Sequence, residues 1–197
     1  MIEYQPIFRS PITVSPAPTK VVSELRVSDL TGVPVVLVQG QADGVLKQHW
    51  STLPAKPGQV VEAGEVLVAR LTPKEVYIFG KSAAAKLPSA ADLASALAQD
   101  QAFAHATDFA HGRAVVKLTG PAAGEALSKI CGLDFHDTVF PNLHVKQTSA
   151  AKIKTLIARC DESGTPVYYL HVDRPLGQYF WEILLDAGQE FGIAAEE

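Results

Sequence analysis

The sequence predicts an α+β fold in which helices cover one face of antiparallel or mixed sheets. Short apolar runs bounded by glycine or proline are typical of buried strands, and they are separated by a few segments with helical spacing. These elements group into two β-α-β-β units with an extra helix and strand, rather than alternating as in a parallel nucleotide-binding sheet. Hydrophobic residues make up 47% and charged residues 19% of the 197 positions, as in ordinary globular proteins.

The first 25 residues are predicted to form an extended, proline-rich arm. The arm contains Pro6, Pro11, Pro16 and Pro18. Each proline fixes φ and removes a backbone donor, which disfavours regular structure. Because such arms often lie against another surface, we expect this one to pack on the second domain or on a partner.

Residues 26–105 are predicted to form the first α+β domain. Apolar runs indicate strands at 35–38, 60–61, 66–69 and 76–79. A short helix is expected at 42–50. A second helix is expected at 90–100, because Ser89 is a suitable N-cap and Asp92 places an acid in the first turn.

Residues 106–197 are predicted to form a second α+β domain that is intertwined with the first. Apolar runs indicate strands at 114–118, 145–148, 153–158 and 167–172. We expect Gly120-Pro121 to open a helix, because proline suits the first helical turn, and Gly132 to end it. The final helix is expected to start near Pro175.

The final helix carries a continuous apolar stripe. Its members recur at helical spacing: Leu176, Tyr179, Phe180, Ile183, Leu184 and Ala187. We interpret the stripe as part of the core, with a groove on a partner chain as the alternative.

Composition and charge argue against several kinds of partner. The net charge is −4, and the 17 lysines and arginines are scattered singly, whereas nucleic-acid binding needs clustered cations. No stretch approaches the ~20 apolar residues of a membrane span, and the start MIEYQPIFRS lacks a basic region followed by an apolar one. We therefore expect a cytoplasmic protein that binds neither nucleic acid nor membrane. Cys131 and Cys160 are interpreted as small apolar side chains.

The motifs GxGxxG, GxxxxGK[ST], HExxH and GxSxG do not occur in the sequence. The densest polar cluster consists of Asp134, His136 and Asp137, with His144 eight residues on. Zinc would need three or four convergent ligands, so we interpret these side chains as ordering a turn through bonds to backbone amides. A metal site and an acid/base pair are the alternatives. The sequence assigns no catalytic residue and no metal ligand.

Three further histidines have a structural interpretation. His105 and His111, with Asp108, are interpreted as polar loop residues, and a catalytic dyad is the alternative. His171 lies in an apolar strand, where we expect a hydrogen-bonded wall residue.

Three aromatic side chains lie near polar segments and are the candidates for cofactor binding. Trp50, Tyr179 and Trp181 are large enough to stack on a pterin, although bulky aromatic residues more often fill a core. The sequence leaves both interpretations open for these three residues.

An ordered series of short matches resembles the γ subunit of heterotetrameric sarcosine oxidase, within the folate-binding aminomethyltransferase (GcvT-like) superfamily. The series begins with the strand–Gly-Pro–helix segment DFAHGRAVVKLTGPAA at 108–123. It continues with LSKICGLDFH at 127–136, Phe140-Pro141 and Gln147-Thr148, and it closes with YFWEILLDA at 179–187. The resemblance implies two small intertwined α/β-sandwich domains of the ferredoxin-like or GcvT-like type.

The resemblance also implies a role inside a heterotetramer. Flavoprotein and NAD-binding subunits would hold FAD, FMN, NAD and tetrahydrofolate, and no cofactor is assigned to this chain. Sarcosine would be oxidatively demethylated on those subunits, with transfer to tetrahydrofolate. The equivalent subunit of an N-methylglutamate dehydrogenase-like complex is an alternative assembly.

The resemblance further implies that the transferase site is lost. Aminomethyltransferases carry a Gly-Gly-Ile-x-Asp-Asp turn in which a carboxylate contacts folate, whereas residues 150–155 of this chain are AAKIKT. Lys152 and Lys154 cannot accept the hydrogen bonds that a carboxylate accepts. The resemblance therefore predicts a non-catalytic subunit. A stand-alone folate-binding module is the second hypothesis, and a small enzyme that uses Asp134 and His136 is the third.

Overall fold

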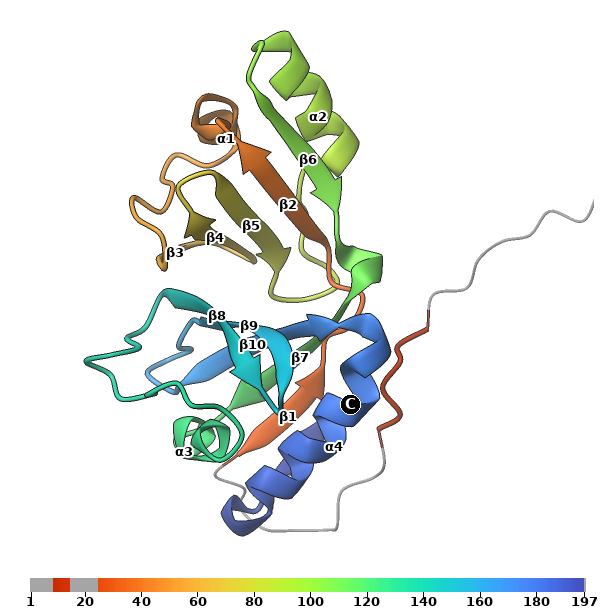
Figure 1. Cartoon of the computed structure of the whole chain (residues 1–197), viewed down its shortest axis with the longest axis vertical. Coiled ribbons are helices and arrows are strands. Elements are labelled where there is room, and N and C mark those ends of the chain that lie inside the picture. Colours follow the sequence, from red (N-terminus) through yellow and green to blue (C-terminus); the bar gives the residue numbers. More distant parts are fainter. Residues whose placement is uncertain (1–8, 15–24, 197) are drawn as a thin grey trace, which may run out of the picture.

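The computed structural model describes residues 9–14 and 25–196, which form four stacked layers. Two β-sheets pack face to face in the middle, and a pair of helices covers the outer face of each sheet (Figure 1). The fold is thus α+β with one mixed and one antiparallel sheet, as the sequence predicts.

The smaller sheet has five antiparallel strands in the order β3-β4-β5-β2-β6. Its strands are β2 (Val35–Gly40), β3 (Val60–Ala63), β4 (Val66–Thr72), β5 (Glu75–Gly80) and β6 (Ala104–Asp108). The helices α1 (Asp43–His49) and α2 (Ala90–Gln99) cover its outer face. Ser89 caps α2 as expected, because its side chain accepts a bond from the Asp92 amide and the Asp92 side chain accepts one from the Ser89 amide.

The larger sheet has six strands in the order β11-β1-β7-β10-β9-β8, and β1–β11 is its parallel pair. Its strands are β1 (Arg26–Asp29), β7 (Arg113–Thr119), β8 (His144–Ala150), β9 (Ile153–Arg159), β10 (Val167–Asp173) and β11 (Ala194–Glu196). The helices α3 (Ala123–Ser128) and α4 (Gly177–Gly188) cover its outer face. Three short 3-10 turns are η1 (Ala110–Gly112), η2 (Arg174–Leu176) and η3 (Gln189–Phe191). Within the described residues, no helix is long and apolar enough to cross a bilayer.

Three strands differ from the sequence-based expectation. Strands β1, β6 and β11 carry no continuous apolar run, and each finds its partners in a sheet that is built mostly from distant segments. Although it falls within 26–105, β1 pairs with β7 and β11 of the larger sheet. The division of the chain into two domains at residue 105 stays a prediction.

The helix after Gly120-Pro121 is shorter than expected. It ends at Ser128, and Gly132 is not among the residues with positive φ, so Gly132 does not end the helix in the left-handed conformation. Gly120 has a φ of 141°, so the flexible glycine is required before the helix rather than after it.

The apolar stripe of α4 is buried only in part. Phe180, Trp181 and Leu184 are packed into the core against the larger sheet. Leu176 and Tyr179 were expected in the same stripe but are 37% and 43% exposed, because they lie at the start of the helix, on its solvent side.

The described part of the proline-rich arm, residues 9–14, packs along the start of α4. Ile12 is buried in the same core cluster, and the Thr13 amide donates to Gln178 Oε1 at 2.7 Å. A Cβ added at Gly177 would come within 2.9 Å of Pro11, so the arm approaches the helix closely at that glycine. Pro6, Pro16 and Pro18 lie outside the described residues.

The inner faces of the two sheets form one apolar layer. Phe79 of β5 packs edge-on against Tyr169 and His171 of β10, with ring centroids at 5.6 and 4.5 Å. Main-chain bonds close one side of this layer, since the Val60 amide donates to the Leu143 carbonyl and the Val145 amide to that of Gly58, each at 2.8 Å.

Gly40 is required at the end of β2. Its φ is +109°, and an added Cβ would lie 2.2 Å from the Phe103 carbonyl oxygen. Gly40→Ala should therefore lower the free energy of unfolding, measured in urea, by about 2 kcal/mol or more. Gly112→Ala is the matched control, because a Cβ there meets nothing within 4 Å. Equal losses in the two variants would contradict this account of Gly40.

Candidate functional site

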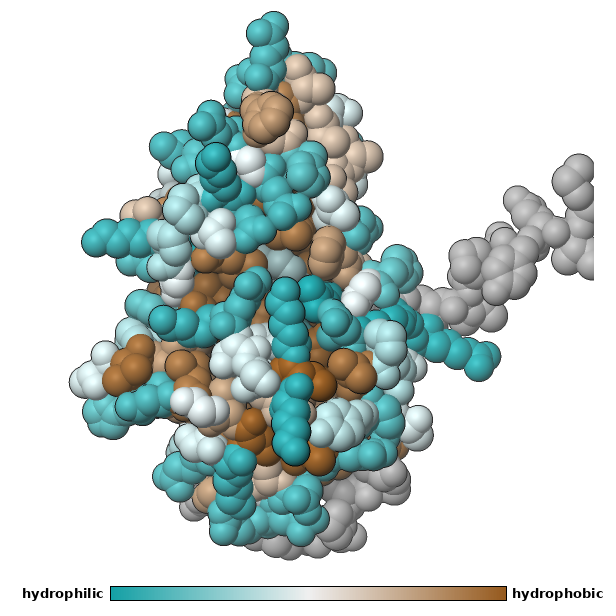
Figure 2. All heavy atoms as spheres, viewed as in Figure 1, coloured by the Kyte–Doolittle hydropathy of each residue, from teal (hydrophilic) through white to brown (hydrophobic). Residues whose placement is uncertain are grey.

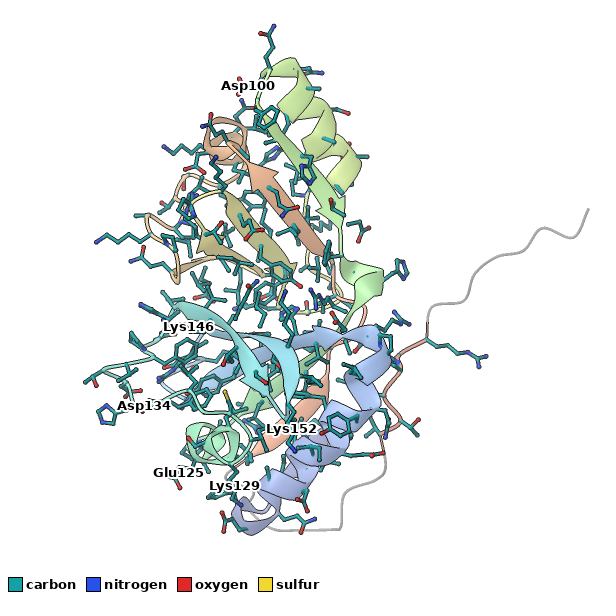
Figure 3. All side chains as sticks on the ribbon, viewed as in Figure 1. Asp100, Glu125, Lys129, Asp134, Lys146 and Lys152 are labelled. Atoms are coloured by element: carbon teal, nitrogen blue, oxygen red, sulfur yellow. The ribbon has the colours of Figure 1, made fainter. Side chains whose placement is uncertain are left out.

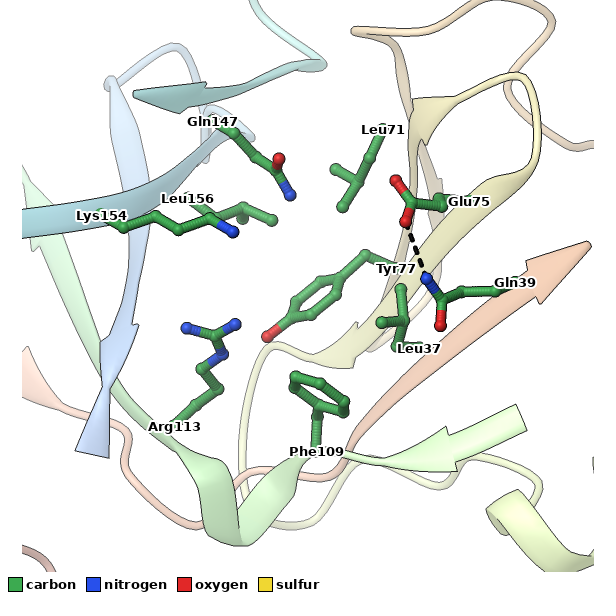
Figure 4. Close-up of a pocket in the computed structure, with 10 residues that line it drawn as sticks. All are labelled: Leu37, Gln39, Leu71, Glu75, Tyr77, Phe109, Arg113, Gln147, Lys154 and Leu156. Atoms are coloured by element: carbon green, nitrogen blue, oxygen red, sulfur yellow. Dashed lines mark hydrogen bonds between the residues drawn. The ribbon is translucent and has the colours of Figure 1, made fainter. Parts of the chain in front are cut away.

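A cavity of about 240 Å³ lies between the two sheets, at one end of the apolar layer (Figure 4). It is lined by Leu37, Gln39, Leu71, Glu75, Tyr77, Phe109, Arg113, Gln147, Lys154 and Leu156. In Figure 2, hydrophobic residues are visible along the boundary between the upper and lower halves, where the inner faces of the sheets meet. We name this space the inter-sheet cavity.

The larger sheet contributes two cations to the inter-sheet cavity. Arg113, at the start of β7, forms an ion pair with Asp173, and its guanidinium lies 5.4 Å from the centroid of the Phe109 ring. Lys154 of β9 extends toward the cavity in Figure 4 and has no ion-pair partner among the described residues. The charge of Lys154 is therefore not compensated within that part of the chain.

The smaller sheet contributes one carboxylate. Gln39 Nε2 donates to Glu75 Oε1 at 2.8 Å (Figure 4). Gln39 Oε1 in turn lies 3.1 Å from His105 Nε2. This chain of bonds fixes the Gln39 amide and holds the Glu75 carboxylate on the side of the cavity that faces away from Arg113.

The floor of the cavity contains a tyrosine that is bonded to a buried histidine. The Tyr77 hydroxyl lies 3.2 Å from His171 Nδ1, which confirms His171 as a hydrogen-bonded wall residue. Burial raises the pKa of Tyr77 above its usual value, and the nearby charge of Arg113 offsets only part of this rise. Burial also lowers the pKa of His171 to about 3.

These pKa shifts bear on the chemistry that the cavity can perform. Tyr77 and His171 both stay uncharged at neutral pH, so neither is set to exchange a proton in that range. The charges that remain around the cavity are Arg113 and Lys154 on one side and Glu75 on the other. This arrangement suits recognition of a charged small molecule better than acid–base catalysis.

The tight turn between β8 and β9 explains why Lys154 lines the cavity and Lys152 does not. Ala151 and Lys152 have φ values of 50° and 64°, as in a two-residue hairpin turn. Side chains alternate along β9, so Lys154 and Leu156 share the inner face while Thr155 faces the helices. Lys152 lies at the tip of the hairpin, beside α4 (Figure 3).

The structure does not bring together the three aromatic candidates for cofactor binding. Trp50 is 8% exposed and packs under α1, whereas Trp181 is 1% exposed and packs under α4. The two indoles therefore lie on the outer faces of different sheets. Tyr179 is exposed and donates from its hydroxyl to the Ala151 carbonyl at 3.1 Å. None of the three lines the inter-sheet cavity.

The polar cluster around Asp134 lies at a different place, beside α3 (Figure 3). It lines a second, open cavity of about 560 Å³. Asp134 Oδ1 accepts a bond from the His136 amide at 2.9 Å, as expected for a residue that orders a turn. His136 Nδ1 lies 2.9 Å from Thr138 Oγ1, so its contact is local too.

Asp137 differs from the expectation of a bond to a backbone amide, because it pairs with Arg159 at 2.6 Å. The hydrogen bond from Arg159 lowers the pKa of Asp137. Arg159 is buried, and it also donates to both oxygens of Asp161 and to the Phe140 carbonyl. Asp137, Asp161 and Arg159 therefore satisfy one another's charges within this second cavity.

The remaining polar candidates stay apart. His144 Nδ1 lies 3.2 Å from the Asn142 carbonyl, away from His136. Asp108 Oδ1 accepts a bond from the Ala110 amide, whereas His105 contacts Gln39, so these two do not form a dyad. In the part of the chain that is described, no three His, Cys, Asp or Glu side chains are grouped as metal ligands.

Both cysteines are free and buried. Burial raises the pKa of the Cys160 thiol to about 12, so this sulfur is not a thiolate at neutral pH. Cys131 Sγ lies 3.9 Å from Thr148 Oγ1 and packs in the core of the larger sheet.

Sequence reasoning missed most of the cavity, including Glu75, Tyr77 and Arg113. These residues come from strands that are distant in the sequence, and no short motif joins them. A usable signal was present in the alternation of the strands. On β5, Phe79, Tyr77 and Glu75 share one face, and the polar member stands at one end.

Comparison with known proteins gives a family match and several structural matches, of which two are described. The family model described as the GCVT N-terminal domain matches residues 38–195. A chain of the heterotetrameric sarcosine oxidase from Corynebacterium sp. U-96, solved in complex with pyrrole 2-carboxylate, matches with a TM-score of 0.73 and 24% identity. The match covers 88% of this chain and 87% of that one.

The second structural match is the glycine cleavage system aminomethyltransferase T from Bartonella henselae. Its TM-score is 0.62 at 13% identity, and the match covers 88% of this chain and 48% of that one. The chain thus spans about half of that protein, and at these identities both structures show a shared fold. No curated protein sequence matches the chain significantly.

The buried His171 should make stability depend on pH. Its pKa is about 3 in the folded state and about 6.5 in an unfolded chain, so acid favours unfolding. The stabilisation by the neutral ring is complete above the unfolded pKa and is lost as the pH falls toward 3. About 2 kcal/mol should be lost from pH 7 to pH 5, because the loss approaches about 1.36 kcal/mol per pH unit below the unfolded pKa.

Urea unfolding at pH 7 and pH 5 measures this loss. His171→Gln keeps a polar partner for Tyr77 but does not titrate in this range. The free energy of unfolding of this variant should therefore fall by about 2 kcal/mol less than that of the wild-type protein between pH 7 and pH 5. The same pH dependence in both proteins would show that His171 is not the group responsible.

Proposed function

The chain belongs to the GCVT N-terminal domain family, and we propose that it is the non-catalytic γ subunit of a heterotetrameric sarcosine oxidase-like complex. The observation that carries this proposal is the structural match to one chain of the Corynebacterium heterotetramer. The match covers nearly the whole of both chains, 88% of this one and 87% of that one. The chain has the length of a subunit in that assembly, whereas it spans only about half of an aminomethyltransferase.

The inter-sheet cavity supports the non-catalytic part of the proposal. Lys154 lines this cavity, and by resemblance its position on β9 corresponds to the segment where aminomethyltransferases carry a folate-contacting acid. An ammonium cannot accept a hydrogen bond from a pterin. Tyr77, on the floor of the cavity, and His171, to which it is bonded, stay uncharged at neutral pH. The lysine and these two neutral groups supply no base on this side of the cavity, and the Glu75 carboxylate lies on the opposite side, bonded to Gln39.

In the proposed complex, flavoprotein and NAD-binding subunits carry FAD, FMN, NAD and tetrahydrofolate. Those subunits oxidatively demethylate sarcosine in the cytoplasm and pass the one-carbon unit to tetrahydrofolate. An N-methylglutamate dehydrogenase-like complex is the alternative assembly, and the substrate is then set by the partner subunits. This chain contributes its surface rather than a reacting group.

Affinity purification of the full chain from its native cells tests the subunit role. We expect flavin-bearing and NAD-binding subunits to copurify in fixed ratio, and sarcosine or N-methylglutamate to bleach the flavin absorbance. The amine that bleaches the flavin identifies which of the two assemblies is present. A monodisperse monomer without a flavoprotein would overturn the proposal.

A variant of the same complex tests whether this chain supplies a reacting group. His136→Ala changes an exposed side chain that bonds locally to Thr138, so the purified complex should turn over its amine at an unchanged rate. Loss of turnover with normal subunit composition would favour the hypothesis of an enzyme that uses Asp134 and His136.

A stand-alone folate-binding module is a second candidate function, supported by the family membership and by a cavity between the sheets. Trp50 and Trp181 both face away from that cavity, so their fluorescence is a poor reporter of binding there. Titration calorimetry of the isolated chain with tetrahydrofolate is the better test. Binding at micromolar concentration, with no partner subunits in native cells, would favour the module over the subunit.

A further inference from the structure

We propose that the inter-sheet cavity binds a small zwitterionic α-amino acid, with the carboxylate directed to Arg113 and Lys154 and the ammonium group directed to Glu75. This assignment goes beyond the subunit role and does not depend on it. It follows from the sign, position and partners of the three charges around the cavity.

The charges are separated by sheet. Arg113 and Lys154 come from the larger sheet, and Glu75 comes from the smaller sheet on the opposite side of the cavity (Figure 4). A ligand that spans the space therefore meets cations at one end and a carboxylate at the other. Because unlike charges attract most strongly where water is partly excluded, a zwitterion fits both ends and a single ion fits only one.

The cationic end of the cavity carries one positive charge without an ion-pair partner in the described part of the chain. Arg113 pairs with Asp173, but Lys154 has no ion-pair partner among the described residues. Two cations beside one cavity repel each other, and an entering carboxylate relieves that repulsion. Gln147 also lines this end and offers an amide that can donate to the carboxylate.

The anionic end is held in place before a ligand binds. Gln39 Nε2 donates to Glu75 Oε1, and Gln39 Oε1 faces His105 Nε2. The second carboxylate oxygen of Glu75 has no hydrogen bond within the described residues, and it remains available to an ammonium group. A ligand with a second carboxylate at this end would be repelled.

Size and wall chemistry narrow the class of ligand. A cavity of about 240 Å³ is smaller than the sites that hold drug-sized molecules, which have volumes of roughly 300–1,000 Å³. Leu37, Leu71 and Leu156 form apolar walls between the charged ends. The space therefore favours an amino acid with a compact aliphatic side chain, for which L-valine is a suitable probe.

Titration calorimetry of the full chain with three probes tests the charge requirement. L-valine carries both charges, isovalerate is the same molecule without the ammonium group, and isobutylamine is the same molecule without the carboxylate. We expect L-valine to bind at least about threefold more tightly than either half, because each charged contact at a partly exposed site contributes up to about 1 kcal/mol.

Three single substitutions locate the site. Lys154→Gln should weaken L-valine and isovalerate alike, by about threefold. Glu75→Gln should weaken L-valine by a similar factor but strengthen isovalerate, because the carboxylate that repels the anion is gone. Lys152→Gln removes the neighbouring lysine at the hairpin tip, outside the cavity, and should change neither affinity. Circular dichroism melts of the variants verify that each remains folded.

Three results would overturn the inference. Isovalerate binding as tightly as L-valine would show a monocarboxylate site. Equal losses in Lys154→Gln and Lys152→Gln would show that the ligand binds by general charge attraction. No heat with L-valine at millimolar concentration would show that the cavity takes no such ligand, and copurification with a flavoprotein would still stand on its own.

Discussion

The contact between the inner faces of the two sheets is the constraint on which the rest of the molecule depends. Each sheet has an outer face covered by helices, so its other face must be buried against something apolar. The rings of Phe79, Tyr169 and His171 meet at the centre of this layer. A charged imidazole there would lack compensation, and burial accordingly keeps His171 neutral. The same packing fixes Tyr77, and through it the floor of the inter-sheet cavity.

The cavity exists because the apolar character of several strands ends at the same side of the molecule. On β2, inner positions change from Val35 and Leu37 to Gln39, and on β9 they change from Ala158 and Leu156 to Lys154. Polar side chains cannot continue a dry interface without partners, so the sheets separate there and leave a space that solvent or a ligand can fill.

Much of the fold could be predicted from sequence, because long apolar runs and clear caps specify local structure. The strands at 66–69 and 167–172 and the helix after Ser89 belong to this class. The short strands β1, β6 and β11 could not be found, because their stability comes from pairing with distant segments rather than from their own residues. The cavity was missed for a related reason. Alternation along each strand shows which residues share a face, but not which strands oppose one another.

One position connects the resemblance, the cavity and the proposed ligand. The resemblance aligns Lys154 with a segment that carries acids in aminomethyltransferases. In the structure, Lys154 and Arg113 line the same cavity. Replacing an acid by a lysine beside an arginine reverses the charge of one wall, while Glu75 keeps the opposite wall negative. A change of this kind removes a hydrogen-bond acceptor and creates a dipolar cavity. The shaped, charged space between the sheets therefore does not depend on an acid at the position of Lys154.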